Sequence, residues 1–194
     1  MASMVGDGVE LYWIPLGAGA GGAVVRWSGR VYEAVTSARE RRRSRELFHS
    51  ALLVRAAGRL ATIEMAPVWV RTGERGVVAE GPVGARCLGR SRLFRYEVRR
   101  WFGGSIPDAA AAIGGPLRVS ASPDVASRIL DLVPEFPTCT WGRDELGLGE
   151  MWNSNTLVSW LLARAGVDVG RLHPPKGGRA PGWDAGLAAA ALAS

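Results

Sequence analysis

Two ionisable residues stand inside otherwise apolar stretches of this 194-residue chain. His49 lies within residues 46–55 and Glu64 within residues 59–65, two stretches with the composition of β-strands. Burying either side chain without a partner is costly. If the strands form a hairpin across Ala57-Gly58, residues whose numbers sum to about 115 lie opposite each other, and His49 and Glu64 become neighbours. A carboxylate beside an imidazole fixes its tautomer, as in an oriented general base, whereas the simpler interpretation is a satisfied core histidine.

Ser154 is the third candidate, because it stands where a buried helix is predicted to begin. Apolar residues at helical spacing predict a helix within residues 151–166, ending at Gly166: Leu157, Val158, Leu161, Leu162 and Ala165. Asn153 and Asn155 flank Ser154, and both are residue types that accept hydrogen bonds from free backbone N–H groups. The positive end of a helix suits a nucleophilic hydroxyl, but it suits a plain helix cap equally well.

The remaining pattern predicts an α+β fold in which an antiparallel β-sheet packs against helices, as a single domain over residues 1–194. Both faces of residues 46–55 are largely apolar, which predicts a strand in the middle of the sheet. Further strands are predicted at residues 9–16, 76–80 and 91–101, and helices at 31–43, 106–113 and 123–133. Residues 134–149 form a long Pro- and Gly-rich loop, and 183–193 are an apolar tail of ambiguous structure.

Composition excludes several classes of protein. Apolar residues make up 47% and charged residues 22%, which is typical of a globular domain. No apolar run reaches the roughly 20 residues of a transmembrane segment, and the first residues do not resemble a secretory signal. With only Cys87 and Cys139 and no signal, we expect a reduced, cytoplasmic protein. Nothing in the sequence indicates a cofactor or a metal.

The net charge of +6 raises the question of nucleic-acid binding. Five arginines gather between Arg39 and Arg45, where Glu40 and the nearby Glu46 offset part of the charge. Because this run has no interleaved aromatic residues, we interpret it as a solvated helix end rather than a nucleic-acid patch. We therefore expect no nucleic-acid partner.

Taken together, a histidine in a strand, a polar residue one strand later and a candidate nucleophile opening a late helix resemble the circularly permuted papain-like group. That group includes the lecithin–retinol acyltransferases and the permuted NlpC-type cysteine peptidases. The matching segments are Leu47-Phe48-His49-Ser50-Ala51-Leu52, Ile63-Glu64-Met65-Ala66-Pro67 and Trp152-Asn153-Ser154-Asn155-Thr156-Leu157. The resemblance covers about residues 46–166. It implies a papain-like fold in which Ser154 is the nucleophile, His49 the general base and Glu64 the polar third member.

The sequence departs from that group at the nucleophile, where a serine stands in place of cysteine. A helix N-terminus and an imidazolium can ionise a thiol, but a serine hydroxyl needs concerted proton removal and an oxyanion hole. Two functions therefore stay open. One is a hydrolase or acyltransferase acting on an amide or ester bond of a small-molecule, peptide or lipid substrate. The other is a catalytically inactive relative whose cleft binds a peptide, lipid or protein, with a lining expected from Asn153, Asn155, Trp152, Trp141 and Asp144.

Overall fold

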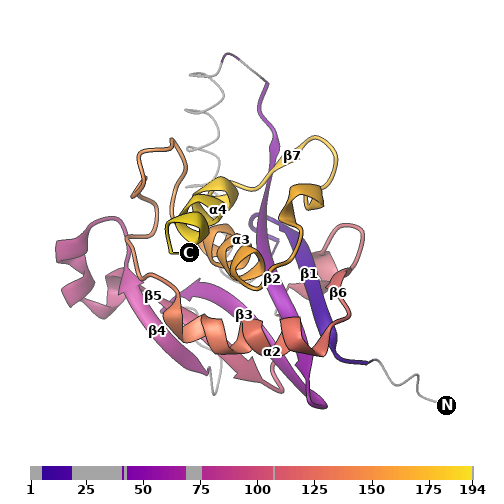
Figure 1. The fold of residues 1–194 in the computed structure, drawn as a ribbon. Helices are drawn as coiled ribbons and strands as arrows, with labels where there is room; N and C mark the ends of the chain where they lie inside the picture. Colours follow the sequence, from indigo (N-terminus) through magenta and orange to yellow (C-terminus); the bar gives the residue numbers. More distant parts are fainter. Residues whose placement is uncertain (1–5, 19–40, 42, 69–75, 107, 194) are drawn as a thin grey trace.

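A seven-stranded sheet forms the centre of the protein in the computed structural model, which describes residues 6–18, 41, 43–68, 76–106 and 108–193 (Figure 1). Six strands follow the order β4-β5-β3-β2-β1-β6 with antiparallel neighbours, and β7 pairs with β2 in parallel. The strands are β1 (Gly8–Pro15), β2 (Glu46–Ala56), β3 (Arg59–Pro67), β4 (Val77–Pro82), β5 (Arg95–Phe102), β6 (Leu117–Ser120) and β7 (Gly178–Arg179).

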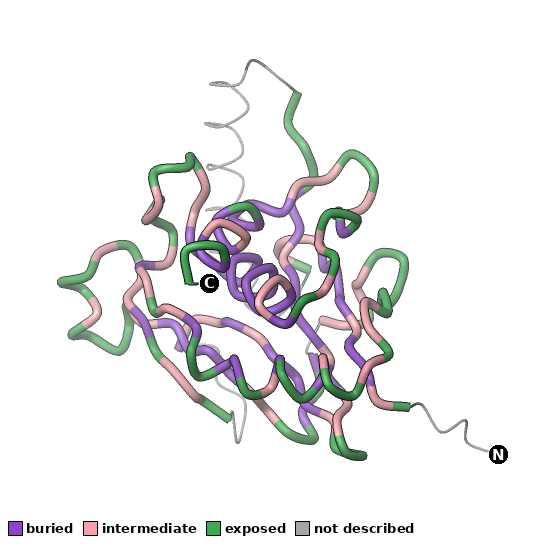
Figure 2. The backbone as a smooth tube through the Cα atoms, in the orientation of Figure 1, coloured by how far each residue is buried: buried purple, intermediate pink, exposed green. Residues whose placement is uncertain are grey.

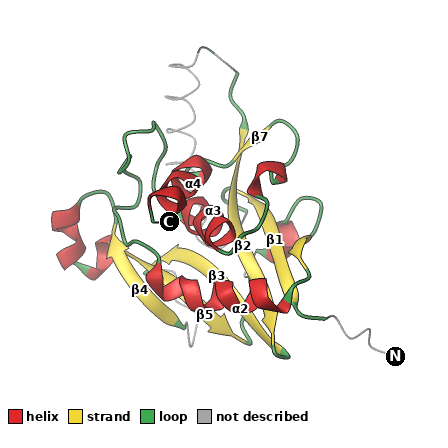
Figure 3. Cartoon of the chain, in the orientation of Figure 1, coloured by secondary structure: helices red, strands yellow, loops and turns green. Residues whose placement is uncertain are grey.

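Three α-helices in the second half of the described chain pack against this sheet, which confirms the predicted α+β class (Figure 3). They are α2 (Pro123–Leu132), α3 (Ser154–Arg164) and α4 (Trp183–Leu192). Short 3-10 turns complete the order: η1 (Arg86–Arg90), η2 (Arg92–Phe94), η3 (Ala109–Ala111), η4 (Val133–Glu135) and η5 (Val169–Arg171). Both α2 and α3 contact β2, while α4 packs on α3.

The β2–β3 hairpin has the register that the sequence predicts. Leu52 pairs with Ile63, so paired residues sum to 115. Ala57 and Gly58 have φ angles of 49° and 72°, the left-handed conformation at both turn positions that matches the twist of a two-residue hairpin. The predicted central place of β2 is also confirmed, since it pairs with β1 along one edge and β3 along the other.

Alternation along β2 divides its side chains between two cores. Phe48, Leu52 and Val54 belong to the main core beneath α2 and α3. His49 and Ala51 point to the opposite face, where Ala51 packs with Tyr12, Ile14 and Ile106 in a smaller cluster. The helix α3 is buried all round over Ser154–Leu162 rather than along one stripe, because it lies between the sheet and α4.

Two local predictions need correction, and a third lies outside the described residues. The strand expected over 91–101 begins only at Arg95, because η2 occupies 92–94. The helix expected over 106–113 is reduced to η3, since a short Ala-rich segment with mostly half-buried or exposed side chains lacks the packing that sustains a helix. The ambiguous tail is the helix α4, and β6 was not predicted. The predicted helix over 31–43 falls almost entirely outside the described residues.

Candidate functional site

The start of α3 is capped by Asn153, one of the residue types from which the sequence predicts a helix start, and the capping is reciprocal. Asn153 is the N-cap: its side-chain oxygen accepts from the Asn155 N–H at 2.8 Å and from the Thr156 N–H. In return, the Thr156 hydroxyl accepts from the Asn153 N–H at 3.1 Å. This capping box satisfies N–H groups that a helix start otherwise leaves free. Ser154 is the first helical residue, and only 6% of it is exposed.

The side chain of Asn155 fixes this helix start to β2 on both sides of His49. Its Nδ2 donates to the Phe48 carbonyl at 2.9 Å, and its Oδ1 accepts from the Ser50 hydroxyl at 2.8 Å. The same Nδ2 also donates to the Pro181 carbonyl at 2.9 Å. The residue that follows Ser154 is therefore bonded to the residues that precede and follow His49.

This junction lies at an edge of β2 that β3 leaves open. The Leu47 carbonyl accepts from Leu16 N–H and so points toward the β1 edge, and the next carbonyl, that of Phe48, points to the other edge. The β2–β3 pairing stops at Leu52 and β7 pairs only with Glu46 and Leu47, so between these two partners Asn155 binds the Phe48 carbonyl in place of a strand. The opening of the hairpin is what admits the start of α3.

His49 as a whole is half-buried, and burial lowers its pKa below the ordinary histidine value. The charge of Asp108 acts in the opposite direction and raises the pKa of His49 by a smaller amount. Burial therefore favours a neutral imidazole near pH 7, the form that can accept a proton. A half-buried histidine with a perturbed pKa is a typical feature of functional sites.

The predicted carboxylate partner of His49 is engaged elsewhere. Glu64 accepts from Arg99 at 2.8 Å, and Arg99 also pairs with Glu97 at 2.9 Å while being only 1% exposed. Extending the hairpin register by one residue sets Glu64 beside Ala51, two residues from His49. Within the described part of the chain, no hydrogen bond joins His49 to Glu64 or to Ser154.

Asp108, which sequence reasoning missed, is the carboxylate that acts electrostatically on His49. Nothing in the sequence links the segment around Asp108 to the strand of His49, because only the tertiary fold brings them together. The same holds for Arg99: its pairing with Glu64 follows from the β3–β5 register, in which these two residues are opposite each other.

The local electrostatics at Ser154 favour negative charge. The first helical N–H groups carry the positive end of the α3 dipole. Asn153 occupies the N–H groups of Asn155 and Thr156, whereas among the described residues no acceptor binds the Ser154 N–H. That N–H can donate to the oxyanion that forms on a carbonyl oxygen when the Ser154 Oγ attacks the carbonyl carbon.

The five residues expected to line a cleft have different surroundings. Asn153 and Asn155 are structural, as described above. Trp152 is 1% exposed and stacks on Phe136 with ring centroids 5.3 Å apart, so it belongs to the core and does not wall a cleft. Trp141 is half-buried against Tyr96 at 5.7 Å.

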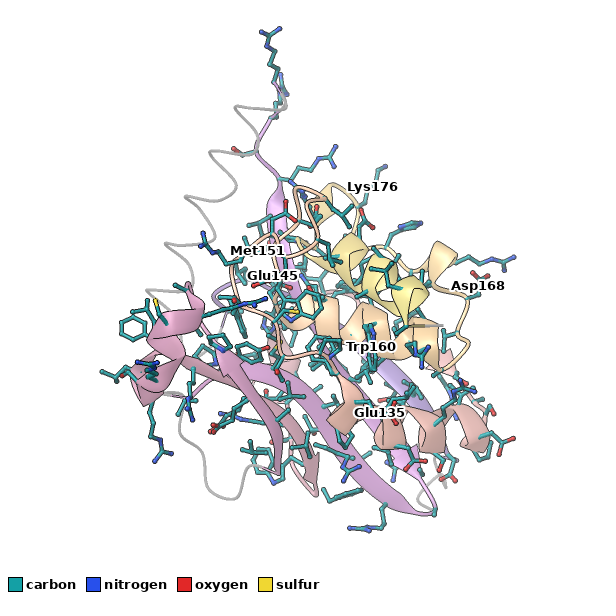
Figure 4. The ribbon with its side chains drawn as sticks, turned by 60° about the vertical axis from the view of Figure 1, so that its left-hand side comes forward. Glu135, Glu145, Met151, Trp160, Asp168 and Lys176 are labelled. Carbon is teal, nitrogen blue, oxygen red and sulfur yellow. The ribbon has the colours of Figure 1, made fainter. Side chains whose placement is uncertain are left out.

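Asp144 is exposed and belongs to an open hollow of about 600 Å³, formed together with Arg86, Cys87, Thr140, Arg143 and Glu145. Its carboxylate accepts from the N–H groups of Gly149 and Leu148, which hold its pKa below the usual range. Glu145 belongs to the loop between η4 and α3, where Figure 4 labels it near Met151. Hydrogen bonds from Thr140, followed by Arg86, keep the pKa of Glu145 low. Both acids thus stabilise this loop.

Comparisons with known proteins provide no relative: no family model, curated protein or solved structure matches this chain. Among the residues that the structure describes, no helix has the length and apolar character needed to cross a membrane. In the same residues, no three His, Cys, Asp or Glu side chains gather as metal ligands. The Arg39–Arg45 cluster is described only at Arg41, Arg43 and Arg45, which are exposed.

Proposed function

We propose that this protein is a hydrolase or acyltransferase that acts on an amide or ester bond through Ser154 and His49. The observation that carries the proposal is the bonding of Asn155 to Phe48 and Ser50. These bonds hold the residue next to Ser154 against the two residues of β2 that flank His49. The lowered pKa of His49 and the unoccupied N–H of Ser154 supply the base and the oxyanion donor that serine chemistry needs.

In the proposed reaction, the Ser154 Oγ attacks the substrate carbonyl while His49 accepts the hydroxyl proton. The Ser154 N–H donates to the oxyanion of the tetrahedral intermediate. His49 then returns the proton to the leaving amine or alcohol as its bond to the carbonyl carbon breaks. Water (in a hydrolase) or another hydroxyl or amine (in an acyltransferase) then attacks the acyl-Ser154 ester and gives its proton to His49. His49 passes that proton to the Ser154 Oγ as its bond to the acyl carbon breaks, which restores the serine.

Asp108 takes the carboxylate role in this proposal, in place of Glu64. Its charge stabilises the imidazolium that forms when His49 accepts the proton. Arg99 neutralises Glu64, which we assign to the ion network that supports the hairpin. The His49 side chain lies on the face of β2 opposite the Phe48 face that packs against α3. The proposed reaction therefore requires a Ser154–His49 hydrogen bond to form around the open edge of β2 when substrate binds.

A fluorophosphonate probe tests the proposal, because it reacts covalently with activated serines. We expect one adduct per chain, located by peptide mapping on Ser154 and lost in Ser154→Ala and His49→Gln. Ser159→Ala is the matched control: it removes another buried hydroxyl of α3, one that donates to the Trp183 carbonyl at 2.8 Å. Labelling of a different residue, or no labelling of the folded protein, would contradict the proposal.

One observation favours a second candidate function, that of a catalytically inactive binding protein. Asn153, Asn155 and Thr156 all serve to fasten α3, and a serine hydroxyl at this position also fits a helix start without any reaction. This candidate predicts that Ser154→Cys creates a thiol that reacts with iodoacetamide faster than Cys87 does, because the helix start lowers a thiol pKa, while the wild-type serine stays inert to fluorophosphonate.

A further inference from the structure

The connection between β4 and β5 is not a tight hairpin turn but a projection of two 3-10 turns over residues 86–94. In Figure 1 it stands out from the end of the sheet on the left, and Figure 2 shows it exposed along most of its length. We call it the 86–94 projection. All of its residues except Gly89 are exposed.

Large apolar side chains are exposed at the surface of this projection. Leu93 is 67% exposed, Phe94 42% and Leu88 40%. Three such residues within seven positions, at the outermost part of a domain, form a concentration of apolar surface that normally marks an interaction site.

Positive charge surrounds these apolar side chains. Arg86, Arg90 and Arg92 are exposed, and residues 83–95 contain no Asp or Glu. From outside the projection, Glu145 pairs with Arg86 at 3.3 Å, and Glu80 pairs with Arg95 at 2.9 Å. No hydrogen bond or ion pair joins the side chain of Arg90 or Arg92 to another described residue. Two arginine side chains therefore remain available to an anionic partner.

The projection is held rigidly by contacts that do not use its exposed side chains. The Arg95 Nε donates to the Gly89 carbonyl at 2.6 Å, and the Ser91 N–H to the Leu88 carbonyl at 2.9 Å. Gly89 lies against Pro82, where a side chain would meet the Pro82 Cβ at 2.9 Å. The apolar side chains are thus presented on a fixed support.

We propose that the 86–94 projection docks the protein onto a lipid surface that carries anionic headgroups. Leu88, Leu93 and Phe94 would enter the boundary between headgroups and acyl chains, and Arg90 and Arg92 would contact lipid phosphates. A bilayer deforms around a small convex tip, whereas a stable protein partner buries roughly 800 Å² on each side, more than three side chains offer. A second copy of this tip would bring like charges together.

Cosedimentation with vesicles tests this proposal on the full chain. We expect binding to vesicles of phosphatidylcholine and phosphatidylglycerol in equal parts at low salt, and none to phosphatidylcholine alone. Leu93→Ser should weaken binding roughly tenfold by removing an inserted apolar side chain. Arg90→Glu should weaken it at least fivefold, because an arginine near an anionic surface contributes about that factor.

Matched controls separate the projection from the general positive charge of the protein. Leu148→Ser removes an apolar side chain that is 51% exposed on another loop, and Arg171→Glu makes the same charge change at a side chain that is 90% exposed. Both should bind vesicles within about twofold of wild type, an effect well below that expected for each projection variant. Absence of vesicle binding, or equal losses in projection and control variants, would overturn the proposal, as would a stable complex with an acidic protein that masks the projection.

Discussion

At the scale of single residues, the sequence predicts only part of the environment of His49 and Ser154. Apolar neighbours in the sequence predict the burial that lowers the pKa of His49. The residues that act on the predicted triad, Asp108 and Arg99, could not be found that way, because they come from segments that only tertiary pairing brings near. The position of Glu64 in an apolar run indicates a buried charge, but it does not show that Arg99 is the partner of that charge.

The titration of His49 makes stability depend on pH. Its pKa is lower in the folded protein than the ordinary value of about 6.5 expected in the unfolded chain. Between these values the unfolded chain binds more protons, so the free energy of unfolding falls as pH drops below about 6.5 and levels off below the folded pKa.

Urea unfolding over a pH series, on wild type and His49→Gln, measures this dependence. The free energy of unfolding of wild type, relative to that of His49→Gln, should fall as pH drops through that window. Asp108→Asn should widen the window, because it removes the charge that raises the pKa of His49. Parallel curves for wild type and His49→Gln would contradict the account of His49.

At the scale of elements, α3 depends on the few polar groups at its start for its position on β2. We expect Asn155→Ala to lower the free energy of unfolding by about 3 kcal/mol, since it leaves the Ser50 hydroxyl and the Phe48 carbonyl buried without their partner. Ser50→Ala removes only one of these bonds and should cost about 1 kcal/mol. Denaturant unfolding measures both, and equal small losses would show that Asn155 does not fasten the helix.

The contact between α3 and α4 depends on the absence of a side chain at Gly186. A Cβ there would meet the Ser159 hydroxyl and the Thr156 carbonyl, both on α3. We expect Gly186→Ala to lower the melting temperature and destabilise the protein by about 2 kcal/mol, because close-packed elements must separate. Gly170→Ala is the control, since its Cβ would make only an ordinary contact of 3.4 Å with Asp168. An unchanged melting temperature in Gly186→Ala would refute this packing.

At the scale of the whole molecule, periodicity predicts the α+β class, the central β2, the β2–β3 register and the capped start of α3. It fails where tertiary context decides: residues 86–94 form two 3-10 turns, residues 106–113 do not form a full helix, and the apolar tail becomes α4 packed on α3. Alternation alone cannot indicate that β3 leaves β2 beyond Leu52, and this opening is what admits α3. The position of the candidate site therefore depends on the residue at which the β2–β3 pairing ends.

The rate at which a fluorophosphonate labels Ser154, followed by intact mass across pH, tests the central claim most directly. We expect a second-order rate constant in wild type that rises with pH to a plateau, with a midpoint below pH 6.5 set by His49. In His49→Gln the plateau should fall by about 100-fold or more, and the midpoint should disappear. An equal rate constant in wild type and His49→Gln, with the adduct on Ser154 in both, would contradict the claim that His49 activates Ser154.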